Sequence, residues 1–478
     1  MKFVLLFNFV LLIFRVFYVL YYPLDLTPEE AQYWDWSRHL DLSYYSKPPM
    51  VAYLNYLSSS ILGYTELAVR IVPISFSFLL SIITYFFSKK FFNEKVATIS
   101  ATLPQISVGF SINSILMTTD APFVFFWSLS LIALWLSLEY EKTIYWFLLG
   151  FFAGLAFLSK YSAVFLLPLA LLYVFFYKRQ VLKEVKPYLS LAVAFLMSLP
   201  VLYWNYKHHF VSFKHVSTLA TKNSSIVNLN SLLEFLGGQL LLVSVIPFFF
   251  ILKGWLFGWK DKALSFLILT SLPIFLFFFA MSIKKHVETN WSGFAYFSGF
   301  LIASYYLSKS KFLYPTYLLS FCLFILLHFS PILDKIGLSK LIPPQKDPAK
   351  VGIGWEALGR EVSKIYRGDE IVISPLYQIS AELAFYVKGN PRTYCLNLGR
   401  RMNQYDLWRD GMKNYLGKDG IYVSYLPIDQ RVLKGFSGII EHRVLPIYWR
   451  GEKIRDFHIY KLRGYNGNIK EESMFRSY

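Results

Sequence analysis

Side chains that could do chemistry are concentrated in one stretch, residues 25–49, which reads DLTPEEAQYWDWSRHLDLSYYSKPP. Each of its two adjacent acids, Glu29 and Glu30, is a candidate catalytic carboxylate. The spacing predicts that they differ, because Thr27 can cap a helix that begins at Pro28, and Glu30 then stands where a capping-box glutamate reaches back to the cap. Glu30 therefore has a structural explanation beside a catalytic one.

Glu29 has no capping partner, and helical spacing places Tyr33 on its face. A free carboxylate that faces a site can act as a general base. The alternative is a solvated acid in the first turn of a helix, which the helix dipole favours. We predict that Glu29 is the catalytic acid of the pair and that Tyr33 lines the site.

The end of the same stretch predicts a rigid strap around Lys47. A residue before proline is driven out of the helical region, so the run Tyr44-Tyr45-Ser46-Lys47-Pro48-Pro49 should be extended. Lys47 is then either an ordinary surface lysine or a fixed cation for a phosphate. Tyr44 and Tyr45 beside it are candidate substrate-lining residues.

The composition indicates which elements position these residues. The chain has 478 residues, of which 55% are hydrophobic, 19% aromatic and 16% charged, and its mean hydropathy is +0.42. These values are typical of a polytopic membrane protein. No small-residue cleavage site follows the N-terminal apolar segment, which we interpret as a retained span. The two cysteines, Cys322 and Cys395, are far apart and indicate neither a disulfide framework nor a CxxC metal site.

Eleven apolar segments are long enough to predict transmembrane helices. They are residues 3–22, 67–88, 96–114, 120–138, 144–159, 161–177, 187–204, 231–252, 263–282, 292–308 and 312–330. The formal net charge of +18 would suit a nucleic-acid partner, but the lysines cluster in alternate short loops, as at Lys89, Lys178 and Lys260. This is the positive-inside pattern of a chain whose N-terminus is cytoplasmic. We therefore expect no nucleic acid, and a first outer loop over residues 23–66.

The polar tail, residues 332–478, follows a predicted membrane domain of residues 1–331. Its strand and helix signals predict a βαβ unit and two further strands, so we expect a small α/β domain on the outer face. The signals are residues 371–374, 380–387, 392–396, 420–426 and 457–462. The tail has no glycine-rich loop of Walker or Rossmann spacing, so nucleotide binding is not expected.

Ionisable residues at the outer ends of predicted spans are further candidates, because charge at membrane depth is costly. Asp120 either caps a helix ahead of Pro122 or belongs to a catalytic site. Lys160, in the turn between two spans, either reaches to lipid headgroups or binds a ligand. Arg70, just inside the second span, is a candidate buried cation for the donor.

The outer loop KKHVETNW, residues 284–291, carries positive charge on the side where it is normally avoided. Lys284, Lys285 and His286 are therefore candidate donor-phosphate ligands, and Asn290 is a candidate substrate contact. No HxxxH pattern accompanies His286, so we assign no metal ligands. A divalent metal cofactor stays open.

This set of residues suits a substrate that is a lipid phosphate carrying a sugar. The carboxylate would deprotonate an acceptor, and the cations would bind the phosphate leaving group. The aromatic side chains of Trp34 and Trp36 would contribute to the walls of the site.

At these residues the sequence resembles a known family. The run PEEAQYWDWSRHLDLSYYSKPPMVAYL is similar to the first outer loop of GT-C polyprenyl-phosphate-sugar glycosyltransferases. These form the protein O-mannosyltransferase superfamily, which includes lipid A aminoarabinose transferases and lipopolysaccharide galacturonic acid transferases. TTDAP, GLAFLSKYSA and HVETNWSGFAY resemble later motifs of that superfamily.

The resemblance implies roles for individual residues. The family's catalytic acid falls on Glu29, the aromatic residue four positions on is Tyr33, the lysine of its K-P motif is Lys47, and the acid of its fourth-span motif is Asp120. Two positions depart from the pattern. The first acid is usually aspartate, and Ser46 stands where the aminoarabinose transferases have a glutamate proposed as part of a metal site. The SKPP form looks more like the galacturonic acid transferases.

We therefore expect a mainly α, polytopic GT-C membrane protein with about eleven transmembrane helices and a C-terminal extracytoplasmic α/β domain. It would lie in the bacterial inner membrane with its active site facing the periplasm. It would transfer galacturonic acid, aminoarabinose or a hexose, with inversion, from an undecaprenyl-type phosphate to lipid A, lipopolysaccharide or another envelope acceptor.

Two alternatives stay open. One is a protein O-mannosyltransferase-like enzyme, and the other is a lipid or sugar transporter or flippase. A transporter would need ionisable residues or helix breaks near the bilayer midplane in repeat-related spans, whereas the polar residues here cluster at the outer ends. An envelope scaffold would have no use for Glu29.

Overall fold

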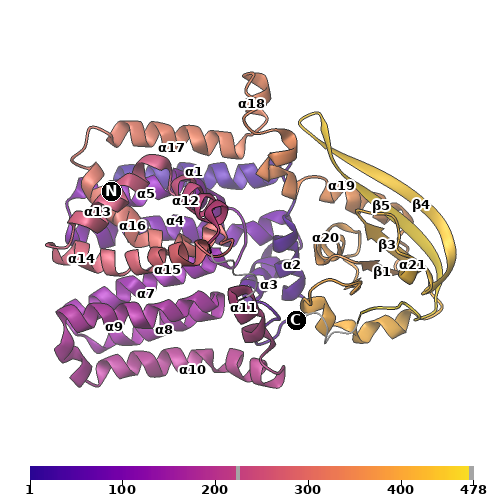
Figure 1. The fold of residues 1–478 in the computed structure, drawn as a ribbon, viewed down its shortest axis with the longest axis horizontal. Helices are drawn as coiled ribbons and strands as arrows, with labels where there is room; N and C mark the ends of the chain where they lie inside the picture. Colours follow the sequence, from indigo (N-terminus) through magenta and orange to yellow (C-terminus); the bar gives the residue numbers. More distant parts are fainter. Residues whose placement is uncertain (222–226, 473–478) are drawn as a thin grey trace.

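The computed structural model describes residues 1–221 and 227–472, and consists of a long helical bundle joined at one end to an α/β region (Figure 1). Within the described residues, five helices are long and apolar enough to cross a membrane, or six if a bent pair counts as one span. These are α1 (Lys2–Tyr21), α4 (Glu66–Phe91), α7 (Asp120–Tyr140), α10 (Lys186–Lys207), the run formed by α14 (Lys262–Leu269) and α15 (Leu272–Ser282), and the bent pair α12 (Leu229–Leu242) and α13 (Val245–Phe257). The chain is a multi-pass membrane protein.

The remaining bundle helices are shorter. They are α5 (Glu94–Ile106), α6 (Val108–Asn113), α8 (Thr143–Ser159), α9 (Leu166–Tyr177), α16 (Tyr296–Leu307) and α17 (Leu313–His328). Every segment predicted to span is largely helical, but three are interrupted, one of them segment 263–282 at residues 270–271 between α14 and α15. Segment 96–114 breaks at Ser107, and segment 231–252 bends by 104° between α12 and α13. Ser244 at that bend has a φ of 67°, which a right-handed helix cannot accommodate, so the prediction of one continuous span there is wrong.

The short loops collect at two opposite ends of the bundle. At the end that holds the N-terminus, the Met1 amino group lies 3.2 Å from Glu94 Oε1 and Lys262 Nζ lies 2.8 Å from Glu139 Oε2. The opposite end holds α2 (Pro28–Ser37), α3 (Met50–Leu62) and α11 (Val211–Thr221) and faces the α/β region (Figure 1). Loops predicted as cytoplasmic therefore meet at one end, and the 25–49 stretch lies at the other.

The α/β region contains one five-stranded sheet in the order β2-β1-β3-β5-β4. Its strands are β1 (Ile371–Ser374), β2 (Thr393–Cys395), β3 (Gly420–Ser424), β4 (Phe436–Trp449) and β5 (Glu452–Tyr465), and its helices are α18 (Ile332–Lys335), α19 (Trp355–Ile365), α20 (Tyr377–Tyr386) and α21 (Gln430–Leu433). β1 pairs in parallel with β2 and β3, with α20 between β1 and β2, which confirms the βαβ unit. β5 pairs antiparallel with β3 and β4.

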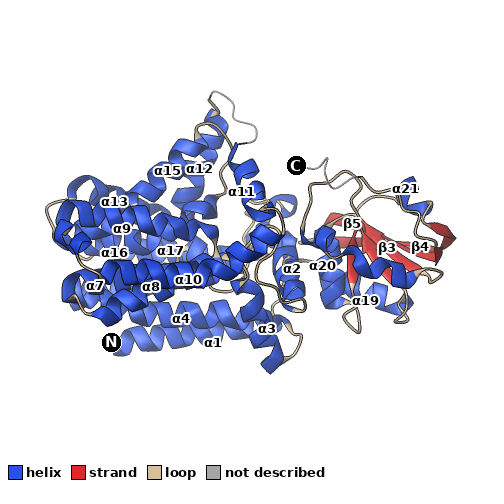
Figure 2. Cartoon of the chain, turned by 90° about the horizontal axis from the view of Figure 1, so that it is seen from below, coloured by secondary structure: helices blue, strands red, loops and turns tan. Residues whose placement is uncertain are grey.

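The α-helices and strands of this region that were not predicted are the short helices α18 and α21, the helix α19 and the long strand β4. Most of β4 is exposed or half-buried, so its sequence, FSGIIEHRVLPIYW, lacks the strict alternation that marks a half-buried strand. α20 lies between the sheet and α2 in both views (Figures 1 and 2). The 25–49 stretch is thus enclosed between the bundle and the α/β region.

Several contacts hold this stretch from the side of the α/β region. Asp25 Oδ2 accepts the backbone N–H of Trp355 at 2.7 Å, at the start of α19. The backbone N–H of Leu26 donates to the Tyr386 hydroxyl at 2.7 Å, and the Tyr405 hydroxyl donates to Asp35 Oδ2 at 2.8 Å. The α/β region therefore fixes the position of α2 from outside the bundle.

Candidate active site

Glu30 holds the start of α2. The Thr27 hydroxyl accepts the N–H of Glu30 at 3.4 Å, and Glu30 Oε2 accepts the N–H of Thr27 at 2.9 Å, which confirms the capping box. The carboxylate is fully buried and also accepts Arg70 Nε at 3.0 Å and the N–H of Met117 at 3.0 Å. Both oxygens are occupied, so Glu30 ties α2 to α4 and to the chain before α7, and does not face a substrate.

Arg70 is the buried partner of this acid. Its guanidinium donates to the carbonyl oxygens of Leu24 at 2.9 Å and Asp25 at 2.7 Å as well as to Glu30, and the side chain is fully buried. A cation enclosed in this way cannot reach a lipid phosphate. We therefore replace the predicted donor-phosphate role of Arg70 with a structural one.

Glu29 faces the opposite way. Nine of the ten residues of α2 are buried, and Glu29 is the one that is exposed. The Tyr33 hydroxyl donates to Glu29 Oε1 at 2.7 Å, as the helical spacing predicts. Burial, reinforced by the Glu29 charge, raises the pKa of Tyr33 well above its usual range, so Tyr33 remains a neutral donor. Tyr33 is itself buried, and it orients the carboxylate rather than lining an open site.

A second carboxylate, Asp120, joins two loops that are far apart in sequence. Lys160 Nζ lies 2.5 Å from Asp120 Oδ1, and Asn290 Nδ2 donates to Asp120 Oδ2 at 2.6 Å. Asp120 is the first helical residue of α7 and not its cap, which is Thr119. The ion pair remains partly open, with 12% of the Lys160 side chain and 15% of the Asp120 side chain exposed. This geometry favours a site role for Asp120 over the capping role.

Lys47 lies in the same neighbourhood. Its carbonyl oxygen accepts the N–H of Tyr44 at 3.1 Å, which closes the strap, and the residue is half-buried. Burial lowers the pKa of Lys47, the charge of Lys160 lowers it further, and the charges of Glu29 and Asp120 raise it. These charges act on Lys47, and Asp120 and Lys160 are in direct contact, so Glu29, Lys47, Asp120 and Lys160 form one candidate site.

The two tyrosines of the strap are packing residues. Tyr44 is fully buried, its ring stacks on Trp36 at a centroid distance of 4.4 Å, and its hydroxyl donates to the Trp36 carbonyl at 3.1 Å. Tyr45 is 2% exposed, and its N–H donates to Gln404 Oε1 at 2.6 Å. Both side chains hold the strap in place and do not line an open cavity.

The loop after α15 reaches the site through Asn290. In the same loop His286 is exposed and contacts acids, with Nδ1 3.1 Å from Glu234 Oε2 and Nε2 3.4 Å from Glu288 Oε1. Lys284 is exposed and Lys285 is half-buried. A phosphate-binding role for these three residues stays a prediction.

Tyr377, at the start of α20, is a site residue that was not predicted. It packs against the cluster that contains Tyr33, and its pKa is raised by burial and then by the charge of Glu29. Its contact with α2 joins residues more than three hundred positions apart. No local pattern around Tyr377 signals this contact.

A cavity of about 260 Å³ borders Asp120 and Asn290. Apolar side chains from α6, α7, α12 and the adjoining chain form most of its remaining wall: Phe110, Ile112, Leu116, Val124 and Leu242. A cavity with a carboxylate and an amide at one side and apolar walls elsewhere suits an amphiphilic ligand.

The residues present do not fit a divalent metal site. Within residues 1–221 and 227–472, no group of three or more His, Cys, Asp or Glu side chains could hold a metal ion. Ser46 supplies no carboxylate beside Lys47. Asp120 is already bonded to a lysine and an asparagine, so we derive no chemical step through a metal.

The fold of this chain is similar to that of a solved membrane protein, ArnT. Crystal structures of ArnT from Cupriavidus metallidurans, in the apo state and bound to undecaprenyl phosphate, each align over 96% of this chain and 98% of theirs. Their TM-scores are 0.67 and 0.69, at 13% and 12% sequence identity. At this identity the likeness establishes a shared fold.

Sequence comparison points the same way. The chain is 28% identical over 286 residues to the lipid A galacturonosyltransferase RgtD of Rhizobium johnstonii, an alignment that covers 58% of this chain and 60% of that protein. It is 30% identical over 177 residues to an undecaprenyl phosphate-alpha-4-amino-4-deoxy-L-arabinose arabinosyl transferase of Pseudomonas aeruginosa, covering 35% and 32% of the two chains. The family model for dolichyl-phosphate-mannose-protein mannosyltransferases matches residues 46–204, which include Lys47, Asp120 and Lys160. The resemblance noted in the sequence is confirmed.

Proposed function

We propose that this protein is an integral-membrane glycosyltransferase that moves a sugar from a polyprenyl-phosphate donor to lipid A or a related lipopolysaccharide acceptor, with inversion. The observation that carries the proposal is the convergence of Glu29, Lys47, Asp120 and Lys160 from separate loops at one end of the bundle. The named activities of the similar proteins, and the undecaprenyl phosphate bound to the related ArnT, support this donor class.

The chemistry follows from the positions of the side chains. An acceptor oxygen attacks the anomeric carbon of the donor sugar while the bond from that carbon to the carrier phosphate oxygen breaks. When the acceptor is a hydroxyl, its proton passes to Glu29, which Tyr33 holds in position. Negative charge develops on the departing phosphate, where Lys47 and Lys160 stabilise it. Asp120 and Asn290 keep Lys160 in place.

The cavity beside Asp120 supports a lipid donor. Its apolar walls offer a place for the first part of the polyprenyl chain, while the phosphate remains near the cations. No nucleotide sugar is needed, because the leaving group is already a lipid phosphate.

The membrane orientation belongs to the same proposal. Residues 1–331 would form the catalytic membrane domain with about eleven spans, and residues 332–478 an extracytoplasmic domain. The site would face the periplasm from the bacterial inner membrane. The meeting of the lysine-rich loops at the end opposite the site supports this orientation.

The test is transfer by the Glu29→Gln variant, measured by mass spectrometry with purified protein in nanodiscs, a polyprenyl-phosphate sugar and lipid A. We expect transfer to be abolished and the melting temperature to be unchanged, because the substitution removes a proton acceptor at an exposed position but keeps its shape. Glu356→Gln, at an exposed acid on α19, is the matched control and should retain activity. Near wild-type turnover by Glu29→Gln would exclude Glu29 as the base.

A further inference from the structure

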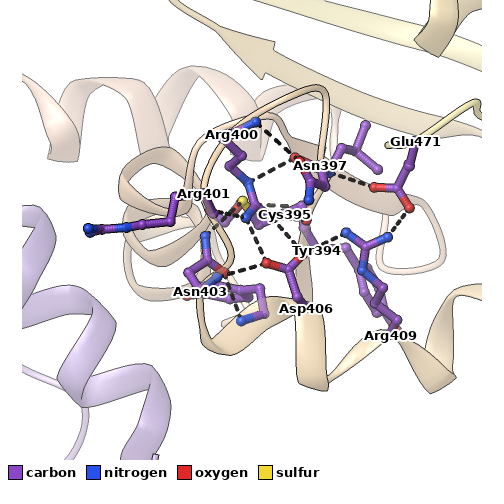
Figure 3. Close-up of polar contacts among 12 residues, drawn as sticks. Tyr394, Cys395, Asn397, Arg400, Arg401, Asn403, Asp406, Arg409 and Glu471 are labelled. Atoms are coloured by element: carbon purple, nitrogen blue, oxygen red, sulfur yellow. Dashed lines mark hydrogen bonds and ion pairs between the residues drawn. The ribbon is translucent and has the colours of Figure 1, made fainter. Parts of the chain in front are cut away.

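A loop of the α/β region reaches the site and is held rigidly. Arg400 bonds Asp406 through two nitrogens, at 2.7 and 3.0 Å, and also donates to the carbonyls of Leu396 and Cys395 at 3.0 and 2.8 Å (Figure 3). Arg409 donates to the same Asp406 carboxylate at 2.7 Å. One carboxylate held by two arginines fixes the chain that follows β2.

The same loop is anchored to the strap that carries Lys47. Met402 is buried against Tyr45, Trp204 and Val211, and Gln404 accepts the N–H of Tyr45. The residues of this loop therefore lie at the border between the α/β region and the bundle, next to the proposed phosphate-binding lysine.

The Arg401 side chain has no part in the network that fixes the loop, although its backbone carbonyl accepts Arg400 Nη1 at 3.0 Å. In Figure 3 its side chain extends away from the Asp406 carboxylate. Among the residues that the structure describes, its guanidinium has neither a hydrogen bond nor an ion pair, and the residue is exposed. The loop is rigid, and its Arg401 side chain is exposed and unpaired among these residues, so the guanidinium is available to an anionic ligand.

The charge of Arg401 acts on groups of the site. Burial lowers the pKa of His215 to about 4, and the charges of Arg401 and Lys47 contribute to that shift. The Arg401 charge also opposes the rise in the pKa of Tyr377, on which Glu29 acts as well. The His215 ring lies 5.0 Å from the Tyr45 ring. The Arg401 charge therefore acts on His215, which packs against the strap, and on Tyr377 of α20.

We propose that Arg401 binds a phosphate ester of the acceptor, and that the loop from Asn397 to Leu407 serves to present it. An arginine matches a phosphate with two parallel N–H bonds, which fixes orientation as well as charge. Lys47 and Lys160 lie on the bundle side, where a membrane-bound carrier phosphate arrives. Arg401 lies on the side of the α/β region and is open to solvent, so it meets the other substrate. This inference rests on the proposed transferase function.

The test is saturation kinetics of Arg401→Gln and Arg401→Lys in the full chain in nanodiscs, with monophosphoryl lipid A and with its phosphate-free form as acceptors. For the phosphorylated acceptor we expect the apparent KM of Arg401→Gln to rise about tenfold, as for the loss of one charge-assisted contact. The donor KM and kcat should stay within about twofold of wild type, because a contact made only with the acceptor should not change the energy of donor binding. Arg401→Lys should recover part of the loss, and the phosphate-free acceptor should show no dependence on residue 401.

Arg367→Gln is the matched control, because Arg367 is an exposed arginine that precedes β1 and so lies at the opposite edge of the parallel strands. An equal change in this control, or an equal effect on the phosphate-free acceptor, would overturn the assignment. A rise in the donor KM alone would assign Arg401 to the carrier phosphate and also overturn it.

Equilibrium binding of monophosphoryl lipid A, measured without donor, separates the two proposals. If the wild type binds it in an Arg401-dependent way but transfers no sugar, the proposed function fails and the binding site stands. If transfer occurs and depends on Glu29 but Arg401→Gln binds the lipid as tightly as wild type, the function stands and the binding site fails.

Discussion

The ion pairs Glu30–Arg70 and Asp120–Lys160, at the end of the bundle that faces the α/β region, differ in how completely they are enclosed. In the first pair the arginine and glutamate side chains are 1% and 0% exposed, and in the second the lysine and aspartate side chains are 12% and 15% exposed. All four residues were candidates for the site on the sequence, and Glu30 also had a local structural explanation, its capping box. The structure separates them into a structural pair and a site pair.

The number of hydrogen bonds explains the difference. The Glu30 carboxylate accepts from Thr27, Met117 and Arg70 and has no capacity left for a ligand. Each oxygen of Asp120 accepts one bond, and Asp120 itself borders a cavity. The Lys160 ammonium donates a hydrogen bond to Asp120 and retains further donors. Saturation of the hydrogen-bonding groups, more than the presence of charge, distinguishes a fold-stabilising pair from one that can bind substrate.

The largest expected effect comes from removing the buried cation. Arg70→Met should lower the free energy of unfolding by about 3–5 kcal/mol, because it leaves the Glu30 charge buried without a partner. Thermal unfolding in detergent micelles measures the loss. Arg360→Met removes an exposed arginine that pairs with Glu356 and should cost less than about 1 kcal/mol.

A second substitution tests whether the buried charge is the cause. Adding Glu30→Gln to Arg70→Met should restore part of the lost stability, since no unpaired carboxylate would remain. If Arg70→Met unfolds like wild type but cannot transfer sugar, Arg70 has a role in the active site and not a structural one.

Replacing the cation of the Asp120–Lys160 pair by methionine should reduce activity and leave stability nearly unchanged. Lys160→Met should leave the melting temperature nearly unchanged and lower kcat about a hundredfold, or about 2.7 kcal/mol of barrier, because a cation that stabilises the departing phosphate is lost. Steady-state kinetics in nanodiscs measures the change. Lys262→Met, which removes the lysine of an exposed pair at the other end of the bundle, should keep full activity. A large loss of stability in Lys160→Met would make this pair structural as well.

The last effect is a pH dependence of stability, and it concerns Glu382 on α20, which lies where the α/β region packs on α2. It is 1% exposed, and neither carboxylate oxygen has a hydrogen-bond partner among the described residues. Burial raises the pKa of Glu382 well above its usual value, the charges of Asp25, Glu30 and Glu66 raise it further, and that of Arg70 opposes them. The folded protein then binds a proton that the unfolded chain has released, so stability falls as pH rises above the unfolded pKa.

Glu382→Gln removes this dependence. Its stability relative to wild type should increase between about pH 5 and pH 8, by at most about 1.4 kcal/mol per pH unit. Melting temperatures of the two proteins across this range measure the change. The exposed Glu356→Gln variant should show no such trend, and a difference between Glu382→Gln and wild type that stays constant with pH would contradict the prediction.

Much of the fold could be predicted because the deciding signals are local. Apolar length predicted helical segments, and strand and helix signals around residues 371–396 predicted the βαβ unit. The bend between α12 and α13 escaped prediction, because hydropathy reports the length of a segment and not its direction. The exposed strand β4 escaped because its partner, and not its own pattern, makes it a strand.

For the site, the sequence alone determined the capping box, the opposite faces of Glu29 and Glu30, and the Tyr33 contact, since all of these lie within one or two helical turns. Only the tertiary structure decided that Arg70 is enclosed, that Asn290 joins Asp120, and that Tyr377 of α20 packs against the cluster that contains Tyr33. These outcomes depend on which distant segments pack together. Burial and hydrogen-bond saturation are properties of that packing, and they decide which charged groups remain free to meet a substrate.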